Sequence, residues 1–168
     1  MSDFSPKEIG GYLELECGNA PLYHSKGIYL NSARNALKFI IESHNIKKSW
    51  IPSYTCPTVL QSIKSTQCEL HFYDIDFQLE PIFPQDTSPD AFFICNNYFG
   101  IQGELINQLS KSHKNIIIDN SQAFFDKNTG FASFYSPRKF FGLPDGGIAI
   151  YNKKAKTRLK LRQDNTSY

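Results

Sequence analysis

The feature that most constrains the fold of this chain is a short apolar run, Asn115-Ile116-Ile117-Ile118, which leads directly into Asp119. β-Branched residues without polar alternation are typical of a strand buried on both faces of a parallel sheet. Asp119 then comes where this strand ends, and open α/β sheets bind ligands at the carboxyl edge of their strands. Gln122 follows three residues later, so we expect it to face the same crevice.

A lysine and a glycine pair lie further along the same stretch. Lys139 comes twenty residues after Asp119, and Gly146-Gly147 opens another apolar segment at 148–151. Pyridoxal 5'-phosphate (PLP) needs a lysine amine for its Schiff base and a carboxylate that keeps its pyridine nitrogen protonated. The residues therefore indicate a PLP site, with Lys139 as the catalytic lysine and Asp119 and Gln122 as cofactor-binding groups.

The order of these motifs resembles that of the DegT/DnrJ/EryC1/StrS family of sugar aminotransferases. The residues that carry the resemblance are Asp119, Gln122, Ser133-Phe134, Lys139 and Asp145-Gly146-Gly147. The resemblance covers about residues 10–151 and implies an α/β fold: a three-layer α/β/α arrangement with a mostly parallel sheet, forming part of the large domain of an aspartate aminotransferase-like fold. It also implies a nucleotide-linked keto-sugar as substrate and an amino donor such as glutamate. A homodimer or higher oligomer is expected, because a sheet that stops after Tyr151 would leave an edge strand and apolar faces uncovered.

The clearest helix is expected over residues 31–45, where apolar residues recur on one face and Asn31 or Ser32 supplies the N-cap. The free N–H groups of a first helical turn can bind an anion, although a plain capped helix explains the pattern equally well. In the resembling family this turn binds the cofactor phosphate. By that resemblance Ala33 and Arg34 give backbone N–H groups to the phosphate, and Ser133 or Ser136 adds a hydroxyl.

The segment Ser53-Tyr54-Thr55-Cys56-Pro57 resembles the family segment whose last aromatic residue stacks on the cofactor ring. Cys56 stands in that place here. Two interpretations of Tyr54 remain open: it supplies the stacking face, or it is an ordinary core residue. Asn97 likewise replaces a histidine of the family pattern.

Strand and helix patterns alternate along the chain and favour right-handed crossovers in a mostly parallel sheet. We expect one PLP-binding-type domain over residues 1–151, with a short strand or extended arm at 10–16, and a basic polar tail at 152–168. Residues 80–90 hold three prolines and are expected to form a loop. His24 lies in a polar connection and is expected to be solvated.

Charge and cysteine content exclude several classes of function. Six of the 18 Lys and Arg residues lie in 153–162, so the rest of the chain carries 12 of them against 16 Asp and Glu. This mildly acidic body argues against nucleic acid as a partner. The four cysteines have neither paired nor metal-ligand spacing, so no metal site is expected. We expect no membrane association and a cytoplasmic protein, because no signal core or membrane-length apolar run is present.

Members of the resembling family continue well beyond the position of Tyr151. The chain is therefore expected to be a fragment or a shortened relative, and not a competent aminotransferase by itself. The alternative function is that of a non-catalytic PLP-fold remnant, which acts as a binding or interaction module.

Overall fold

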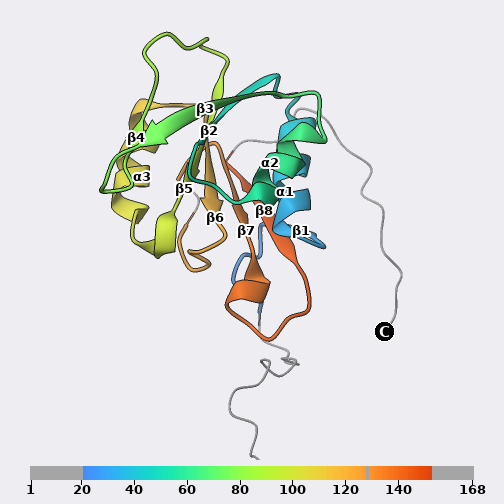
Figure 1. Cartoon of the computed structure of the whole chain (residues 1–168). Helices are drawn as coiled ribbons and strands as arrows, with labels where there is room; N and C mark the ends of the chain where they lie inside the picture. The colour runs from blue at the N-terminus through green and yellow to red at the C-terminus, as the bar shows by residue number, and fades with distance from the viewer. Residues whose placement is uncertain (1–20, 128, 153–168) are drawn as a thin grey trace, which may run out of the picture.

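The computed structural model describes residues 21–127 and 129–152, and its centre is one eight-stranded sheet (Figure 1). The strand order is β1-β8-β7-β6-β5-β2-β3-β4. The strands are β1 (Ile28–Leu30), β2 (Lys48–Pro52), β3 (Glu69–Ile75), β4 (Pro81–Ile82), β5 (Phe92–Asn96), β6 (Ile116–Asn120), β7 (Ala132–Tyr135) and β8 (Gly147–Tyr151). The helices are α1 (Ala33–Ser43), α2 (Pro57–Lys64) and α3 (Gly103–Ser112), with two short 3₁₀ turns, η1 (Tyr98–Gly100) and η2 (Pro137–Lys139).

The five central strands, β7-β6-β5-β2-β3, are parallel to one another. At one edge β8 pairs antiparallel with β7 and β1 pairs antiparallel with β8, and at the other edge β4 pairs antiparallel with β3. From β2 the chain moves outward to β3 and β4, and then returns to β5 on the other side of β2. The strand order thus reverses between β2 and β5. Such a reversal opens a crevice at the carboxyl ends of the strands, where ligands of α/β folds bind.

Helices cover both faces of this sheet, so the expected three-layer α/β/α arrangement with a mostly parallel sheet is confirmed. In Figure 1, α1 and α2 lie on one side of the sheet and α3 lies on the other. Successive side chains of β6 point to opposite faces: Ile117 packs in the cluster that contains α1, while Ile116 and Ile118 pack against Ile106 of α3. This double burial explains why β6 needs an uninterrupted isoleucine run.

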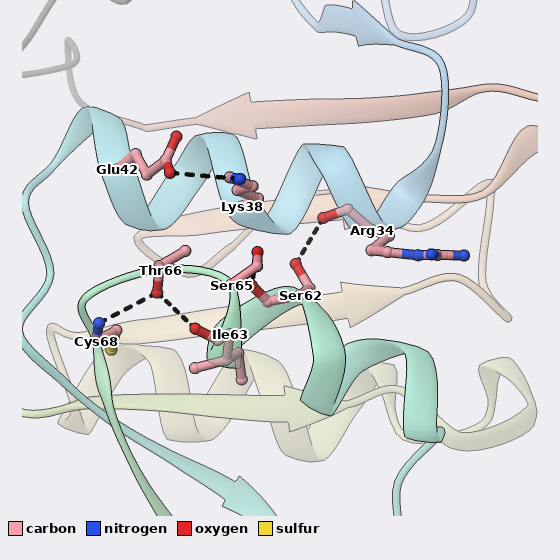
Figure 2. Close-up of polar contacts among 8 residues, drawn as sticks. All are labelled: Arg34, Lys38, Glu42, Ser62, Ile63, Ser65, Thr66 and Cys68. Carbon is pink, nitrogen blue, oxygen red and sulfur yellow. Dashed lines mark hydrogen bonds and ion pairs between the residues drawn. The ribbon is translucent and has the colours of Figure 1, made fainter.

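The N-terminus of α1 is capped as the sequence predicts. Ser32 is the N-cap, and its Oγ accepts a hydrogen bond from the backbone N–H of Asn35 at 3.2 Å. Figure 2 shows how α2 is fixed beside α1: the buried Ser62 hydroxyl donates to the backbone carbonyl of Arg34 at 2.7 Å. The exposed ion pair between Lys38 and Glu42, at 3.8 Å, adds little because water screens it.

Three strands were absent from the elements predicted by sequence. β1 and β4 are edge strands of three and two residues, too short to show a period, and β4 lies in the segment predicted to be a loop. β7 is completely buried although its sequence, Ala-Ser-Phe-Tyr, contains a serine. The division into a domain of residues 1–151 and a tail of 152–168 stays a prediction, because residues 1–20 and 153–168, with the arm and the basic run, lie outside the described residues. Among the residues that are described, no helix has the length and apolar character needed to cross a bilayer.

His24 differs from its expected solvated state, because its side chain is only 8% exposed. Its Nε2 lies 2.7 Å from the backbone carbonyl of Phe124, so this nitrogen carries the proton and donates it. The ring also lies against Tyr135, with centroids 4.2 Å apart. Burial lowers the pKa of His24, and the hydrogen bond to Phe124 opposes that shift. The segment before β1 is thereby held to the loop that follows β6.

We predict that acid weakens this attachment. Since the folded pKa of His24 lies below its ordinary value of 6.5, the unfolded chain binds the proton first and stability falls as the pH drops through that region. His24→Gln keeps a donor for the Phe124 carbonyl but does not titrate. Urea unfolding midpoints at about pH 7.5 and about pH 5.5 should differ less in this variant than in the wild type. His113→Gln serves as the control, and an equal loss of pH dependence there would contradict the assignment.

Candidate active site

A cavity of about 400 Å³ lies at the carboxyl ends of β2, β5 and β6. The first turn of α1 and η2 also line it. The cavity brings together seven of the eight residues that the sequence indicates: Ala33, Arg34, Tyr54, Asp119, Gln122, Ser136 and Lys139. Its position at the reversal of strand order is the one that the fold predicts for a ligand.

The glycine pair at the start of β8 determines where the first turn of α1 lies. Gly146 has φ +116, a conformation that side chains rarely adopt, and its N–H donates to the Asn31 carbonyl at 3.0 Å. Gly146 also forms an isolated parallel bridge with Ser32. A Cβ on Gly147 would overlap the Ser32 backbone. The Gly-Gly sequence is therefore required because β8 begins in contact with the N-terminus of α1.

Because of that contact, the first turn of α1 lies in the wall of the cavity. Ala33 is partly buried and Arg34 is exposed, and both line the cavity. The N–H groups of a first helical turn have no partners within the helix, and the helix dipole adds positive potential there. With the Arg34 guanidinium nearby, this corner of the cavity suits an anion such as a phosphate.

Asp119 also lines the cavity, near the end of β6 and in register with Asn96 of β5 and Phe134 of β7. Its Oδ1 accepts a hydrogen bond from the Ser121 N–H at 2.8 Å. Burial raises the pKa of the Asp119 carboxyl, while the Ser121 hydrogen bonds and the positive charge of Lys139 lower it. A cationic partner at this position would favour the ionised carboxylate, because an opposite charge offsets the effect of burial on its pKa.

Lys139 is the last residue of η2 and is exposed in the cavity. The two aromatic residues that follow it do not line the cavity. Phe140 and Phe141 instead pack on a buried cluster that contains Phe124 and Tyr135. They anchor the end of η2 and leave the amine of Lys139 in the open part of the site.

The two candidate serines lie in different places. Ser136 lines the cavity and is 3% exposed. Ser133 is fully buried within β7 and does not line the cavity. Of the two, only Ser136 could donate its hydroxyl to a ligand without a rearrangement of the sheet.

Tyr54 is 60% exposed on the cavity wall, so its interpretation as an ordinary core residue is wrong. Its ring stacks on Tyr98, with centroids 5.7 Å apart and planes inclined by 24°. The Tyr98 hydroxyl also donates to the Tyr54 carbonyl at 2.6 Å. Tyr54 is therefore a supported aromatic surface that faces the cavity.

Cys56, the other departure from the family pattern, lines the cavity as the N-cap of α2. Its Sγ lies 3.0 Å from Oγ1 of Thr58. The hydrogen bonds with Thr58 lower the pKa of the Cys56 thiol, while burial opposes this shift and the charges of Lys139 and Asp119 act in opposite directions. A polar, ionisable group thus takes the position of an aromatic ring.

Some residues of the cavity wall were missed in the sequence, chiefly Asn96, Phe99 and Ser121. Ser121 lies between two indicated residues and could have been inferred from them. Phe99 could not be inferred in this way. A left-handed backbone is usually signalled by glycine, and this position holds a phenylalanine. Across residues 21–127 and 129–152, no three His, Cys, Asp or Glu side chains converge as metal ligands would.

No family model matches the chain. No curated protein matches it by sequence either. Solved structures do match. The aminotransferase TlmJ from Streptoalloteichus hindustanus has a TM-score of 0.63 at 16% identity, over 76% of this chain and 40% of its own. A Streptococcus pneumoniae protein assigned as a sugar aminotransferase, in its PLP form, gives 0.63 at 16% identity, over 76% and 42%.

NtdA from Bacillus subtilis, with the cofactor PMP bound, matches with a TM-score of 0.63 at 16% identity, over 76% of this chain and 33% of its own. The chain therefore spans only about two fifths or less of the length of these proteins. At such identities the likeness concerns the fold. The chain has part of the fold of PLP-dependent aminotransferases.

Proposed function

We propose that this chain binds PLP in the cavity and serves as the cofactor-binding part of a sugar aminotransferase of the DegT/DnrJ/EryC1/StrS type. The observation that carries the proposal is the meeting of Asp119, Lys139 and the first turn of α1 around one cavity. An acid, an amine and an anion site are the three groups that PLP requires. The neighbouring structures that contain PLP or PMP support the same cofactor.

The cavity fits this group in size and in polarity. Ligand sites commonly enclose roughly 300–1,000 Å³ and combine apolar walls with a few placed polar groups. Here the Asp119 carboxyl is partly buried and its pKa is raised by desolvation, so a protonated pyridine nitrogen would supply a favourable opposite charge. The first turn of α1 with Ser136 would hold the phosphate, and Tyr54 and Cys56 lie where they would meet the ring.

Each residue then has a separate task. Bound PLP supplies an electron sink for the carbon that bears the amino group. Lys139 would attach the cofactor through its amine and, once released, move a proton on the substrate. Asp119 would keep the pyridine nitrogen protonated, and Gln122 would contact the ring oxygen. The walls formed by Tyr54 and Phe99 would exclude water from one side of the site.

The substrate and the assembly are finer parts of the proposal. A nucleotide-linked keto-sugar, with glutamate as amino donor, is supported by the motif order and by the neighbour assigned as a sugar aminotransferase. A homodimer is supported by exposed apolar side chains, among them Phe72 of β3, Ile82 of β4 and Phe77 between these strands. Both statements concern a whole protein, and the match to this chain covers only 40% and 42% of the two relatives.

The first test is the identity of the lysine. Incubation with PLP followed by borohydride should fix one cofactor to Lys139, as found by peptide mapping. Lys139→Arg retains the positive charge beside Asp119 but has no attachable amine, so trapping should fall to background. Lys114→Arg is the matched control and should label normally. A label on Lys38 or Lys114 in the wild type would rule out the assignment.

A second test separates cofactor attachment from chemistry. Asp119→Asn keeps an oxygen for the Ser121 N–H but removes the charge that holds the pyridine nitrogen protonated. The variant should still be labelled with borohydride, while its half-reaction with glutamate slows on the order of 10²-fold. Stopped-flow absorbance measures the rate, with the exposed Asp86→Asn as control. An unchanged rate in Asp119→Asn would show that the carboxylate has no such role.

A third test distinguishes the two serines. Ser136→Ala should weaken PLP binding about tenfold, because it removes one hydrogen bond to a charged phosphate. Ser133→Ala should leave the PLP affinity unchanged, since the Ser133 side chain is enclosed in the sheet. Absorbance titration with PLP gives both affinities. The reverse result, with Ser133→Ala as the weaker binder, would move the phosphate away from Ser136.

A further inference from the structure

A strained residue lies at the rim of the cavity. Phe99, within η1, has φ 55 and ψ 10, the left-handed conformation that side chains other than those of Gly, Asn and Asp rarely adopt. Its ring is 64% exposed, so apolar burial does not offset the cost of this conformation. Strain of this kind persists only where the surrounding contacts enforce it, and it gathers at functional sites.

The enforcing contacts come from Asn97, which is 2% exposed. Its Nδ2 donates to Asp126 Oδ2 at 2.7 Å and to Asn120 Oδ1 at 3.1 Å. Its Oδ1 accepts from the Gln102 N–H at 3.0 Å, and its own N–H donates to the Asp119 carbonyl at 3.0 Å. Asn97 therefore ties both ends of the turn to β6 and to the start of α3.

The strained turn positions one hydrogen-bond donor, the backbone N–H of Phe99. The Phe99 N–H donates to Oε1 of Gln122 at 2.9 Å. A backbone N–H can only donate, so the amide atom that faces Phe99 must be the oxygen. The planar amide of Gln122 then turns its Nε2 hydrogens away from Phe99, and Gln122 lines the cavity.

We propose that Phe99 is a positioning residue whose left-handed backbone fixes the polarity of Gln122. Gln122 thereby offers the cavity a hydrogen-bond donor and not an acceptor. This inference rests on the proposed function, in which the ligand near Gln122 is the ring oxygen of PLP. A fixed donor would stabilise that oxygen in its anionic form, because charge-assisted hydrogen bonds are the stronger ones.

One arm of the test needs no cofactor. Hydrogen exchange of the Phe99 backbone amide, followed by NMR, should be slow in the wild type and in Gln122→Glu, since both present an oxygen to it. In Gln122→Met, which is similar in length but has no acceptor, exchange should be at least about tenfold faster. Equal exchange in the wild type and Gln122→Met would overturn the inference, whether or not the protein binds PLP.

The second arm tests whether the side chain at position 122 presents a hydrogen-bond donor or an acceptor to the cavity. A glutamate held by the Phe99 N–H would turn an acceptor toward the PLP oxygen, so Gln122→Glu should bind PLP more weakly than Gln122→Met does. A weaker affinity in Gln122→Met than in Gln122→Glu would refute a donor role. If the wild type takes up no PLP at all, the proposed function fails, while the exchange arm still decides whether Phe99 holds Gln122.

A matched pair of variants isolates the backbone of Phe99 from its ring. Phe99→Gly and Phe99→Ala both lose the ring, but only glycine adopts a positive φ without strain. Phe99→Ala should therefore bind PLP about fivefold more weakly than Phe99→Gly. Equal affinities in the two variants would mean that the left-handed conformation does not position Gln122.

Discussion

The candidate site depends on the contact between the start of β8 and the first turn of α1. Gly146 and Gly147 let two backbone segments touch where a Cβ would overlap the Ser32 backbone. The contact places the free N–H groups of α1 at the same level as the carboxyl ends of β5 and β6. Without it, the sheet would still present Asp119, but the anion corner of the cavity would lie elsewhere.

The charges of the cavity are arranged around this geometry. The anion corner at α1 and the carboxyl group of Asp119 lie on different walls, and Lys139 is near enough to Asp119 to lower its pKa. A ligand that carries an anionic group at one end and a cationic ring nitrogen at the other satisfies both walls together. The charges of Lys139 and Asp119 also act on the thiol of Cys56, which makes its part of the cavity wall more polar than an aromatic residue would.

Much of the fold and of the site could be predicted from the sequence, because the relevant signals are local. The isoleucine run of β6 requires burial on both faces, the cap of α1 is a serine at the right position, and Gly-Gly marks a close approach. What could not be predicted depends on tertiary contacts. The local sequence does not distinguish Ser133 from Ser136 as a phosphate ligand. Ser133 is enclosed because β7 pairs within the sheet, whereas Ser136 follows β7 and lines the cavity.

His24 and Phe99 show the same limit. The burial of His24 follows from its contact with Phe124, a hundred residues away, and no local pattern encodes that. Phe99, with its left-handed backbone, lies in a turn that Asn97 holds through hydrogen bonds to partners in β6 and beyond it. The burial of His24 and the turn that contains Phe99 thus depend on contacts with residues that are distant in the sequence.

The contact between Ser32 and Gly147 also has a consequence for the order in which the protein matures. The two residues are separated by more than a hundred positions, and the same distance separates β1 from β8, which pair at the edge of the sheet. During synthesis α1 emerges from the ribosome long before β8 does. The helix can form early, but its first turn reaches its final place only after residue 147 has been made. Contacts of such long range are slow to close. A nascent chain that ends before β8 would therefore have no completed anion corner, and the site would be assembled only when the last described strand is added.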